Sequence, residues 1–145
     1  MLDVDTRRYF AYGSNMDRQQ MRGRCPGAVL LGTARLPGYR FIINRAGVAS
    51  VVSMGCHEVL GVLWDITATD EGALDDYEGV GEGWYYKTIL PLITPNGREQ
   101  AMLYIACDQT EGAPHRHYMA NIVAAALDFD FPATYVGELR SWLRR

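Results

Sequence analysis

The sequence predicts an α+β fold in which a small, mostly antiparallel β-barrel is flanked by helices. Two observations lead to this prediction. Strand-like runs follow one another closely with few helices between them, and the residues after Pro114 repeat apolar side chains at helical spacing. The 145 residues contain no linker and no internal repeat, so we expect one domain, residues 1–145, that is large enough to bury one core.

The first expected element is a β-strand over residues 8–12, where an aromatic-rich run stops at a Gly-Ser-Asn turn. A short helix is expected over about residues 16–22. Ser14 or Asn15 is its predicted N-cap, because a short polar side chain can accept a hydrogen bond from the first backbone N–H groups. Asp17 then falls in the first turn, where a negative charge complements the helix dipole.

Strand-like runs fill most of the next part of the chain. Turn residues separate them into residues 28–36, 39–44, 48–54, 59–66, 84–93 and 100–106. The run 59–66 is almost wholly apolar, which predicts a strand buried on both faces. Pro95-Asn96-Gly97 predicts a hairpin turn between the last two strands.

Helices are expected in three further places. Residues 69–77 form the first, because acids at its start suit the helix dipole. The second follows Pro114, where Tyr118, Ile122 and Ala125 share one helical face. The third follows Pro132, which suits the first turn of a helix.

Composition and charge exclude several classes of protein. With 14 basic and 17 acidic residues the net charge is −3, so a nucleic-acid partner is not expected. The longest apolar runs are far shorter than the ~20 residues of a membrane span, and residues 1–8 lack the apolar core of a signal peptide. Cys25, Cys56 and Cys107 have no paired spacing, which is typical of a reducing compartment. We therefore expect a cytoplasmic protein with no membrane partner.

The turn after the first strand is one candidate for a binding site. A strand that runs into Gly13-Ser14-Asn15 and then a helix presents free backbone N–H groups beside a helix N-terminus. Such groups hold carboxylates, phosphates or developing oxyanions. An ordinary capped turn is the alternative interpretation, since Ser and Asn are common caps.

Glu78 is the second candidate. Residues 70–82 hold six acids and no base, so the rest of the chain has 14 cations against 11 acids. A solvated helix face explains most of these acids. Glu78 differs because it stands at the predicted end of the helix, where the dipole, partial burial and nearby carboxylates would all raise its pKa. A carboxylate of raised pKa can act as a general acid and base near neutral pH.

Other reactive residue types do not form a site in the sequence. His115 and His117 are spaced i, i+2 at a helix start and do not share a face, so we expect surface residues and no metal pair. Cys56 and His57 are neighbours in a strand and point to opposite faces. The chain has no Gly-x-Ser-x-Gly nucleophile motif.

Several of these segments resemble the γ-glutamylcyclotransferase family. The likeness rests on Tyr9-Phe10-Ala11-Tyr12-Gly13-Ser14-Asn15-Met16 and on Leu74-Asp75-Asp76-Tyr77-Glu78-Gly79-Val80 with the following Gly83-Trp84-Tyr85. It extends to residues 61–64, 114–118 and 132–135, and thus covers most of the chain in order.

The resemblance implies a small barrel with flanking helices and an enzyme that needs no metal or organic cofactor. Such an enzyme releases 5-oxoproline and a free amine from a γ-glutamyl amino acid or amide, because the α-amine of the substrate attacks its own γ-carbonyl. By matching position, Glu78 is the implied general acid/base. The implied binding residues for the small γ-glutamyl substrate are Tyr12, Gly13, Ser14, Asn15 and Tyr118.

Three points stay open at this stage. A non-catalytic binding module for a γ-glutamyl or other carboxylate ligand is one alternative, and an enzyme that removes a γ-glutamyl group from a natural-product intermediate is another. His115 replaces a small hydroxyl residue found in relatives, which concerns the outer pocket that receives the leaving amine. The sequence also leaves a homodimer open.

Overall fold

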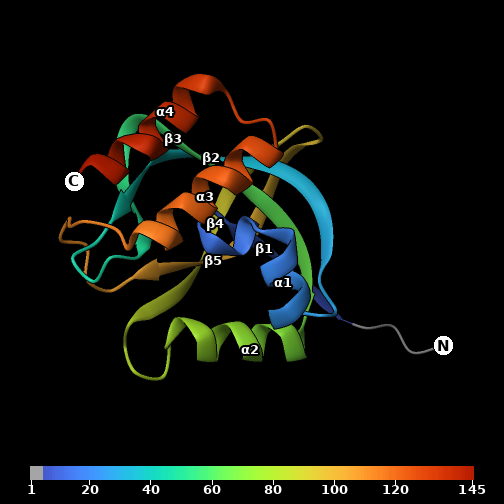
Figure 1. Ribbon diagram of the computed structural model, residues 1–145. Coiled ribbons are helices and arrows are strands. Elements are labelled where there is room, and N and C mark those ends of the chain that lie inside the picture. The colour runs from blue at the N-terminus through green and yellow to red at the C-terminus, as the bar shows by residue number, and fades with distance from the viewer. Residues whose placement is uncertain (1–4) are drawn as a thin grey trace.

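Five strands form a closed barrel in the order β1-β3-β2-β4-β5 (Figure 1). The computed structural model describes residues 5–145. The prediction that residues 1–8 are no signal peptide therefore falls partly on residues 1–4, which lie outside the described residues. The strands are β1 (Thr6–Ala11), β2 (Val29–Ile43), β3 (Ala49–Thr67), β4 (Tyr85–Thr94) and β5 (Gly97–Ala106). Neighbours pair antiparallel except β1 and β5, which pair parallel. The predicted mostly antiparallel barrel with flanking helices is confirmed.

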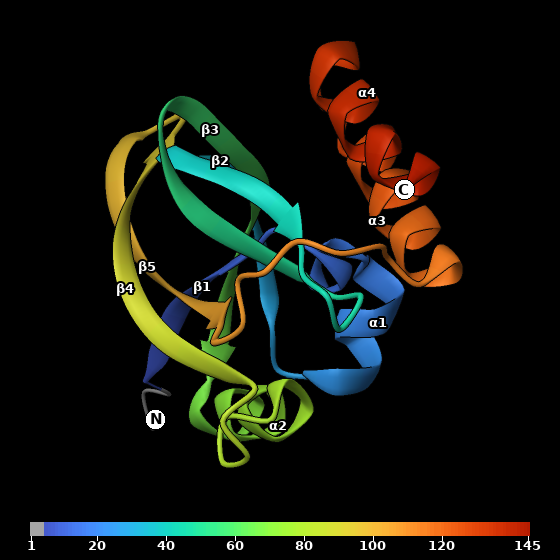
Figure 2. The ribbon, with the colours of Figure 1, turned by 90° about the vertical axis from the view of Figure 1, so that its left-hand side faces the viewer.

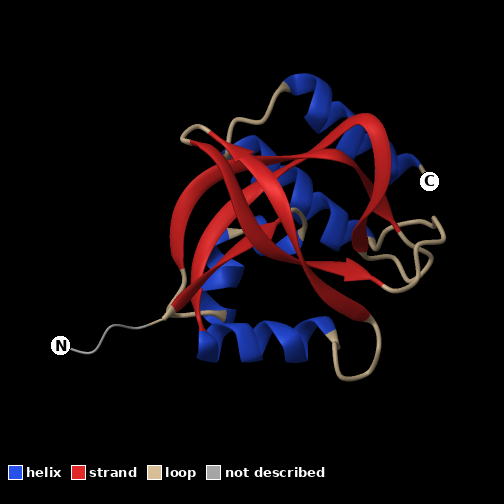
Figure 3. Cartoon of the chain, turned by 180° about the vertical axis from the view of Figure 1, so that it is seen from behind, coloured by secondary structure: helices blue, strands red, loops and turns tan. Residues whose placement is uncertain are grey.

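Two long strands replace four of the predicted short ones. Residues 28–36 and 39–44 join as β2, and residues 48–54 and 59–66 join as β3. The pairing shifts from Pro37↔Glu58 to Tyr39↔Ser53, so the Gly and Pro signals mark a bulge and not a turn. A bulge bends the strands that carry it, and the strands of the barrel are strongly curved (Figure 3).

The middle of β3 lies at the centre of the core. Residues 59–64 and 66 are buried, as the apolar run predicted. A Cβ at Gly61 would lie 2.5 Å from the backbone oxygen of Ala11. Glycine therefore lets β1 and β3 cross closely just before the turn that follows β1.

Four helices pack against the barrel. They are α1 (Arg18–Arg24), α2 (Ala68–Glu78), α3 (Arg116–Asp128) and α4 (Ala133–Ser141), with 3-10 turns η1 (Ser14–Met16) and η2 (Trp142–Arg144). Figure 2 shows α3 and α4 stacked on one side of the barrel and α2 beneath it. No helix among residues 5–145 is both long and apolar enough to cross a membrane.

The start of α1 differs from the prediction. Asp17 is the N-cap, and its carboxylate accepts hydrogen bonds from the backbone N–H groups of Gln19 and Gln20. Ser14 and Asn15 make no capping hydrogen bond and lie in η1. The predicted cap was wrong because a separate 3-10 turn comes before the helix, and this leaves both side chains free for the interior.

The ends of α2 and α4 also differ slightly from the predictions. Thr67 and Asp70 form a capping box that starts α2 at Ala68. The helix ends at Gly79, whose φ of 65° is left-handed, so Glu78 is its last residue. Pro132 is the N-cap of α4 and does not lie in its first turn.

Candidate active site

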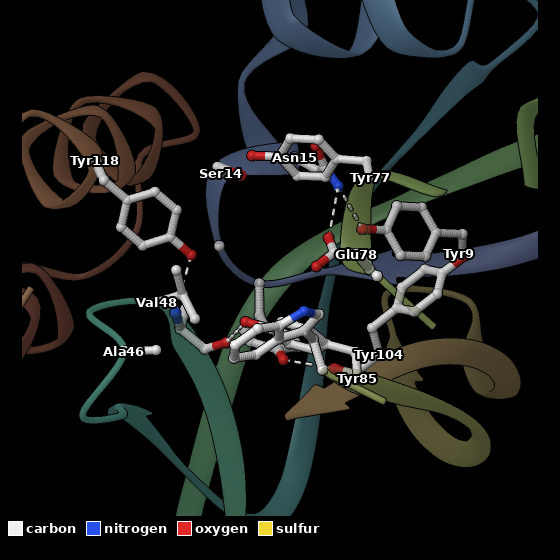
Figure 4. A pocket seen from close by; sticks show the side chains of 15 residues that line it. Tyr9, Ser14, Asn15, Ala46, Val48, Tyr77, Glu78, Tyr85, Tyr104 and Tyr118 are labelled. Atoms are coloured by element: carbon white, nitrogen blue, oxygen red, sulfur yellow. Dashed lines mark hydrogen bonds between the residues drawn. The ribbon is translucent and has the colours of Figure 1, made fainter. Parts of the chain in front are cut away.

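A pocket of about 310 Å³ opens between the turn after β1, the end of α2, the start of β3 and the start of α3 (Figure 4). Its wall is mostly aromatic. The lining residues are Tyr9, Tyr12, Gly13, Ser14, Asn15, Ala46, Val48, Ala49, Tyr77, Glu78, Gly79, Trp84, Tyr85, Tyr104 and Tyr118. All six residues predicted for the site, namely Tyr12, Gly13, Ser14, Asn15, Glu78 and Tyr118, lie in this one pocket.

The backbone of the Gly13–Asn15 turn forms one wall. Gly13 accepts a hydrogen bond from Met16 N–H at 3.1 Å through its carbonyl, which starts the 3-10 turn. Within residues 5–145, the N–H groups of Gly13, Ser14 and Asn15 have no hydrogen-bond partner. The indole N–H of Trp64 donates to the carbonyl of Asn15 at 3.2 Å and fixes the turn to the barrel. The turn thus offers backbone donors to an anionic group.

The side chain of Asn15 links the turn to Glu78. Its amide nitrogen donates to the hydroxyl of Tyr9 at 2.9 Å and points to Glu78 Oε1 at 3.5 Å. Its amide oxygen accepts a hydrogen bond from Arg24 at 2.5 Å. The guanidinium of Arg24 also stacks 3.4 Å from the centre of the Tyr77 ring. Arg24 therefore sets the orientation of the Asn15 amide, and with it the donor that faces Glu78.

The surroundings of Glu78 change the pKa of its carboxylate. Burial raises its pKa from an ordinary 4.5 to about 7, and the positive charge of Arg24 acts in the opposite direction. The predicted contribution of burial is confirmed. The predicted contribution of neighbouring carboxylates is wrong, because burial and the charge of Arg24 account for the shift.

Three other acids of α2 make contacts of their own. Asp70 closes the capping box and accepts from the backbone N–H of Gly27. Lys87 donates to Glu71 at 2.6 Å and to Asp75 at 3.0 Å. Asp75 also accepts from the hydroxyl of Tyr104 at 2.7 Å. The acids beside Glu78 therefore hold α2 on the barrel.

Tyrosines form much of the rest of the wall, and the hydroxyls of Tyr12, Tyr85 and Tyr118 each make a defined hydrogen bond. Tyr12 donates to the carbonyl of Tyr104 at 2.5 Å, and Tyr85 donates to the carbonyl of Ala49 at 2.6 Å. Tyr118 reaches in from α3, and its oxygen accepts from Ala49 N–H at 2.9 Å (Figure 4). Burial raises the pKa of Tyr12, Tyr85 and Tyr118 well above the ordinary value, so the hydroxyls stay neutral.

Sequence reasoning missed part of the lining. Tyr104 belongs to a fully buried stretch of β5 that gives no alternating pattern. Arg24 looks like an ordinary basic residue at a helix end. Ala46 and Val48 come from the β2–β3 hairpin, and no local signal points from that hairpin to Glu78. Tyr9, Tyr77, Trp84 and Tyr85 stood inside the motifs of the family resemblance without being assigned to the site.

The remaining reactive side chains are not part of the pocket lining. His115 and His117 are exposed, as predicted, and His115 Nε2 contacts the carbonyl of Ala46 at 3.1 Å. Cys56 and His57 are exposed on the β3 bulge. Within the part of the chain that the structure describes, no three His, Cys, Asp or Glu side chains form a group that could hold a metal ion.

Three proteins with a similar sequence or fold share the name gamma-glutamylcyclotransferase. Gamma-glutamylcyclotransferase of Homo sapiens is 26% identical over 150 residues, which covers 96% of this chain and 80% of the relative. Gamma-glutamylcyclotransferase of Mus musculus is 27% identical over 144 residues, covering 92% and 77%. A solved structure named gamma-glutamyl cyclotransferase superposes with a TM-score of 0.86 at 25% identity, covering 94% of this chain and 87% of that one.

One family model matches a segment that contains Glu78. Residues 58–139 match the model of the AIG2-like family, and this segment runs from the central part of β3 through α2 and the β4–β5 hairpin to α4. The three likenesses confirm the resemblance to the γ-glutamylcyclotransferase family. Since more than half of the sequence matches in one continuous stretch, the chain belongs to the AIG2-like family.

Proposed function

We propose that the protein is a γ-glutamyl cyclotransferase that releases 5-oxoproline and a free amine from a γ-glutamyl amide. One observation carries the proposal: Glu78, with a pKa raised to about 7, lines the same pocket as the free N–H groups of Gly13–Asn15. The relatives named gamma-glutamylcyclotransferase, which align over nearly the whole chain, support it.

The reaction needs no nucleophile from the protein. Deprotonated Glu78 takes one proton from the α-ammonium group, and the freed amine attacks the γ-carbonyl carbon to close a five-membered ring. Protonated Glu78 then donates to the departing nitrogen as its bond to carbon breaks. The ring nitrogen passes its surplus proton through the same carboxylate to the released amine. A pKa near 7 suits a group that must accept and donate in one cycle.

The turn and the aromatic wall supply the rest of the catalysis. A pocket that holds the substrate curled gains effective molarity, which lowers the barrier by up to about 7–11 kcal/mol in well-oriented intramolecular reactions. The N–H groups of Gly13–Asn15 hold a negative charge, either the α-carboxylate or the oxyanion on the γ-carbonyl. The neutral tyrosines exclude water and maintain the burial that raises the pKa of Glu78.

The test is the release of 5-oxoproline from γ-glutamyl-alanine and other γ-glutamyl amides. We expect turnover by the wild type and a loss of about 10²-fold or more for Glu78→Gln, as for other general bases. Asp76→Asn is the matched control, because Asp76 is an exposed acid of the same helix, and it should retain wild-type turnover. Stabilisation by these amides without any 5-oxoproline would refute catalysis and indicate a binding module.

A further inference from the structure

Two large aromatic side chains stay exposed beside Glu78. Trp84 has 63% of its surface exposed and Tyr77 has 47%, although both line the pocket. Tyr77 precedes Glu78 in the chain. The indole of Trp84 lies over Gly79, the residue after Glu78, because a Cβ placed there would be 2.6 Å from Trp84 Cδ1. The two rings therefore flank the carboxylate proposed to act on the departing nitrogen.

The backbone of Trp84 and the ring of Tyr77 are held in place without a ligand. The backbone N–H of Trp84 donates to the carbonyl of Gly79 at 3.0 Å, and the carbonyl of Trp84 accepts from the backbone N–H of Cys107 at 3.0 Å. Arg24 stacks on the ring of Tyr77 at 3.4 Å. Exposed apolar surface that is fixed by its surroundings often marks a binding surface, and here it continues the wall of a pocket.

The charge around these rings favours apolar contact over an ion pair. Within the described residues that line the pocket, Glu78 and tyrosines are the ionisable side chains, and no Lys, Arg or His is among them. Glu82 lies on the same side, with Oε2 at 3.3 Å from the Cβ position of Gly79. A carboxylate on the leaving group would meet the negative charge of Glu82 near Trp84. The cation at the Tyr77 ring, Arg24, already donates a hydrogen bond to Asn15.

We propose that Trp84 and Tyr77 form a subsite for the leaving amine, and that the preferred substrates are γ-glutamyl amides of amines with an aromatic or similarly large apolar group. This inference rests on the proposed cyclotransferase function. The inner pocket holds the γ-glutamyl part that all such substrates share, and the two rings contact the part that differs. Aromatic pairs gain affinity beyond the area that they bury, so the subsite discriminates between amines.

The experiment compares two γ-glutamyl amides whose amine parts carry no charge in the substrate and differ only by an aromatic ring. Release of 5-oxoproline is measured with γ-glutamyl-phenethylamide and γ-glutamyl-ethylamide, and the readout is the ratio of their kcat/KM values. We expect a kcat/KM ratio of about tenfold or more in the wild type. Trp84→Phe should retain most of this preference, because it keeps an aromatic ring. Trp84→Ala and Trp84→Leu should reduce the ratio to about threefold or less. Tyr86→Ala is the matched control: Tyr86 is also an exposed aromatic residue of β4 but is absent from the lining, so the ratio should not change.

The possible failures are distinguishable. A wild-type ratio near one, or a ratio that survives both Trp84→Ala and Trp84→Leu, overturns the aromatic subsite and leaves the cyclotransferase function standing. Absence of 5-oxoproline from both amides overturns the proposed function and this inference together. Circular dichroism melts establish that each variant is folded, and because the readout is a ratio, a partial loss of active protein cancels.

Discussion

The raised pKa of Glu78 has a consequence for stability that can be measured without any substrate. Its pKa is about 7 in the folded protein against an ordinary 4.5. Between these two values the folded protein holds a proton that the unfolded chain has released, so stability falls as the pH rises. One pKa unit corresponds to about 1.4 kcal/mol, and the full difference therefore costs about 3 kcal/mol above pH 7.

Glu78→Gln removes this cost and keeps the shape of the side chain. We expect the variant to match the wild type well below pH 4.5, where Glu78 is protonated in both states, and to become more stable than the wild type as the pH rises. Above pH 7 the gain approaches about 3 kcal/mol, which moves the urea midpoint by about 1.5 M for a slope near 2 kcal/mol/M. The variant is thus expected to be inactive and more stable at once.

Urea unfolding at pH 5, 6, 7 and 8 measures this prediction. The decisive quantity is the difference in unfolding free energy between Glu78→Gln and the wild type at each pH. A difference that is constant with pH would refute the argument, because the substitution would then act through contacts and not through the proton. If the variant is less stable than the wild type at pH 8, the ionised carboxylate of Glu78 stabilises the folded protein, whereas burial predicts that it destabilises it.

Two other substitutions test how Glu78 is held. Arg24→Gln removes the charge that lowers the pKa of Glu78, so the acid limb of the pH profile of kcat/KM should move to higher pH. An unchanged limb would contradict this role of Arg24. Arg22→Gln is the control, because Arg22 is an exposed residue of the same helix. Gly79→Ala places a side chain at φ 65° against an indole, so urea unfolding should give a loss of about 1–2 kcal/mol or more, whereas Gly81→Ala, with open space around it, should stay within about 0.5 kcal/mol.

The sequence predicted the elements well where the signal was local. The apolar run 59–66, the Pro95-Asn96-Gly97 turn and the helix that ends near Glu78 each follow from residues close together in the chain. The break at Pro37-Gly38 was misinterpreted because Gly and Pro mark turns and bulges alike. Which of the two forms depends on the partner strand, since β3 supplies the unpaired residues opposite the bulge.

The candidate site was predictable only in part, because most of its geometry comes from contacts between distant segments. The Gly13–Asn15 turn and Glu78 stand in recognisable motifs. Arg24 has no such signal, although its hydrogen bond orients the amide that faces Glu78. A basic residue at the end of a helix is fully explained by the helix dipole, so nothing in the local sequence distinguishes it from Arg22.

The acidic segment at residues 70–82 shows that the charges near a residue in the sequence need not be the charges that act on it in the fold. Residues 70–82 hold six acids, which suggested that nearby carboxylates raise the pKa of Glu78. Lys87, the one lysine of the chain, lies between Glu71 and Asp75 and bonds to both. Arg7 also pairs with Glu71, so two cations offset the charge of these two acids. The pKa of Glu78 then depends on two effects: burial raises it and the charge of Arg24 lowers it. Both effects come from the packing of the barrel and α1 around the end of α2, and not from the neighbouring acids in the sequence.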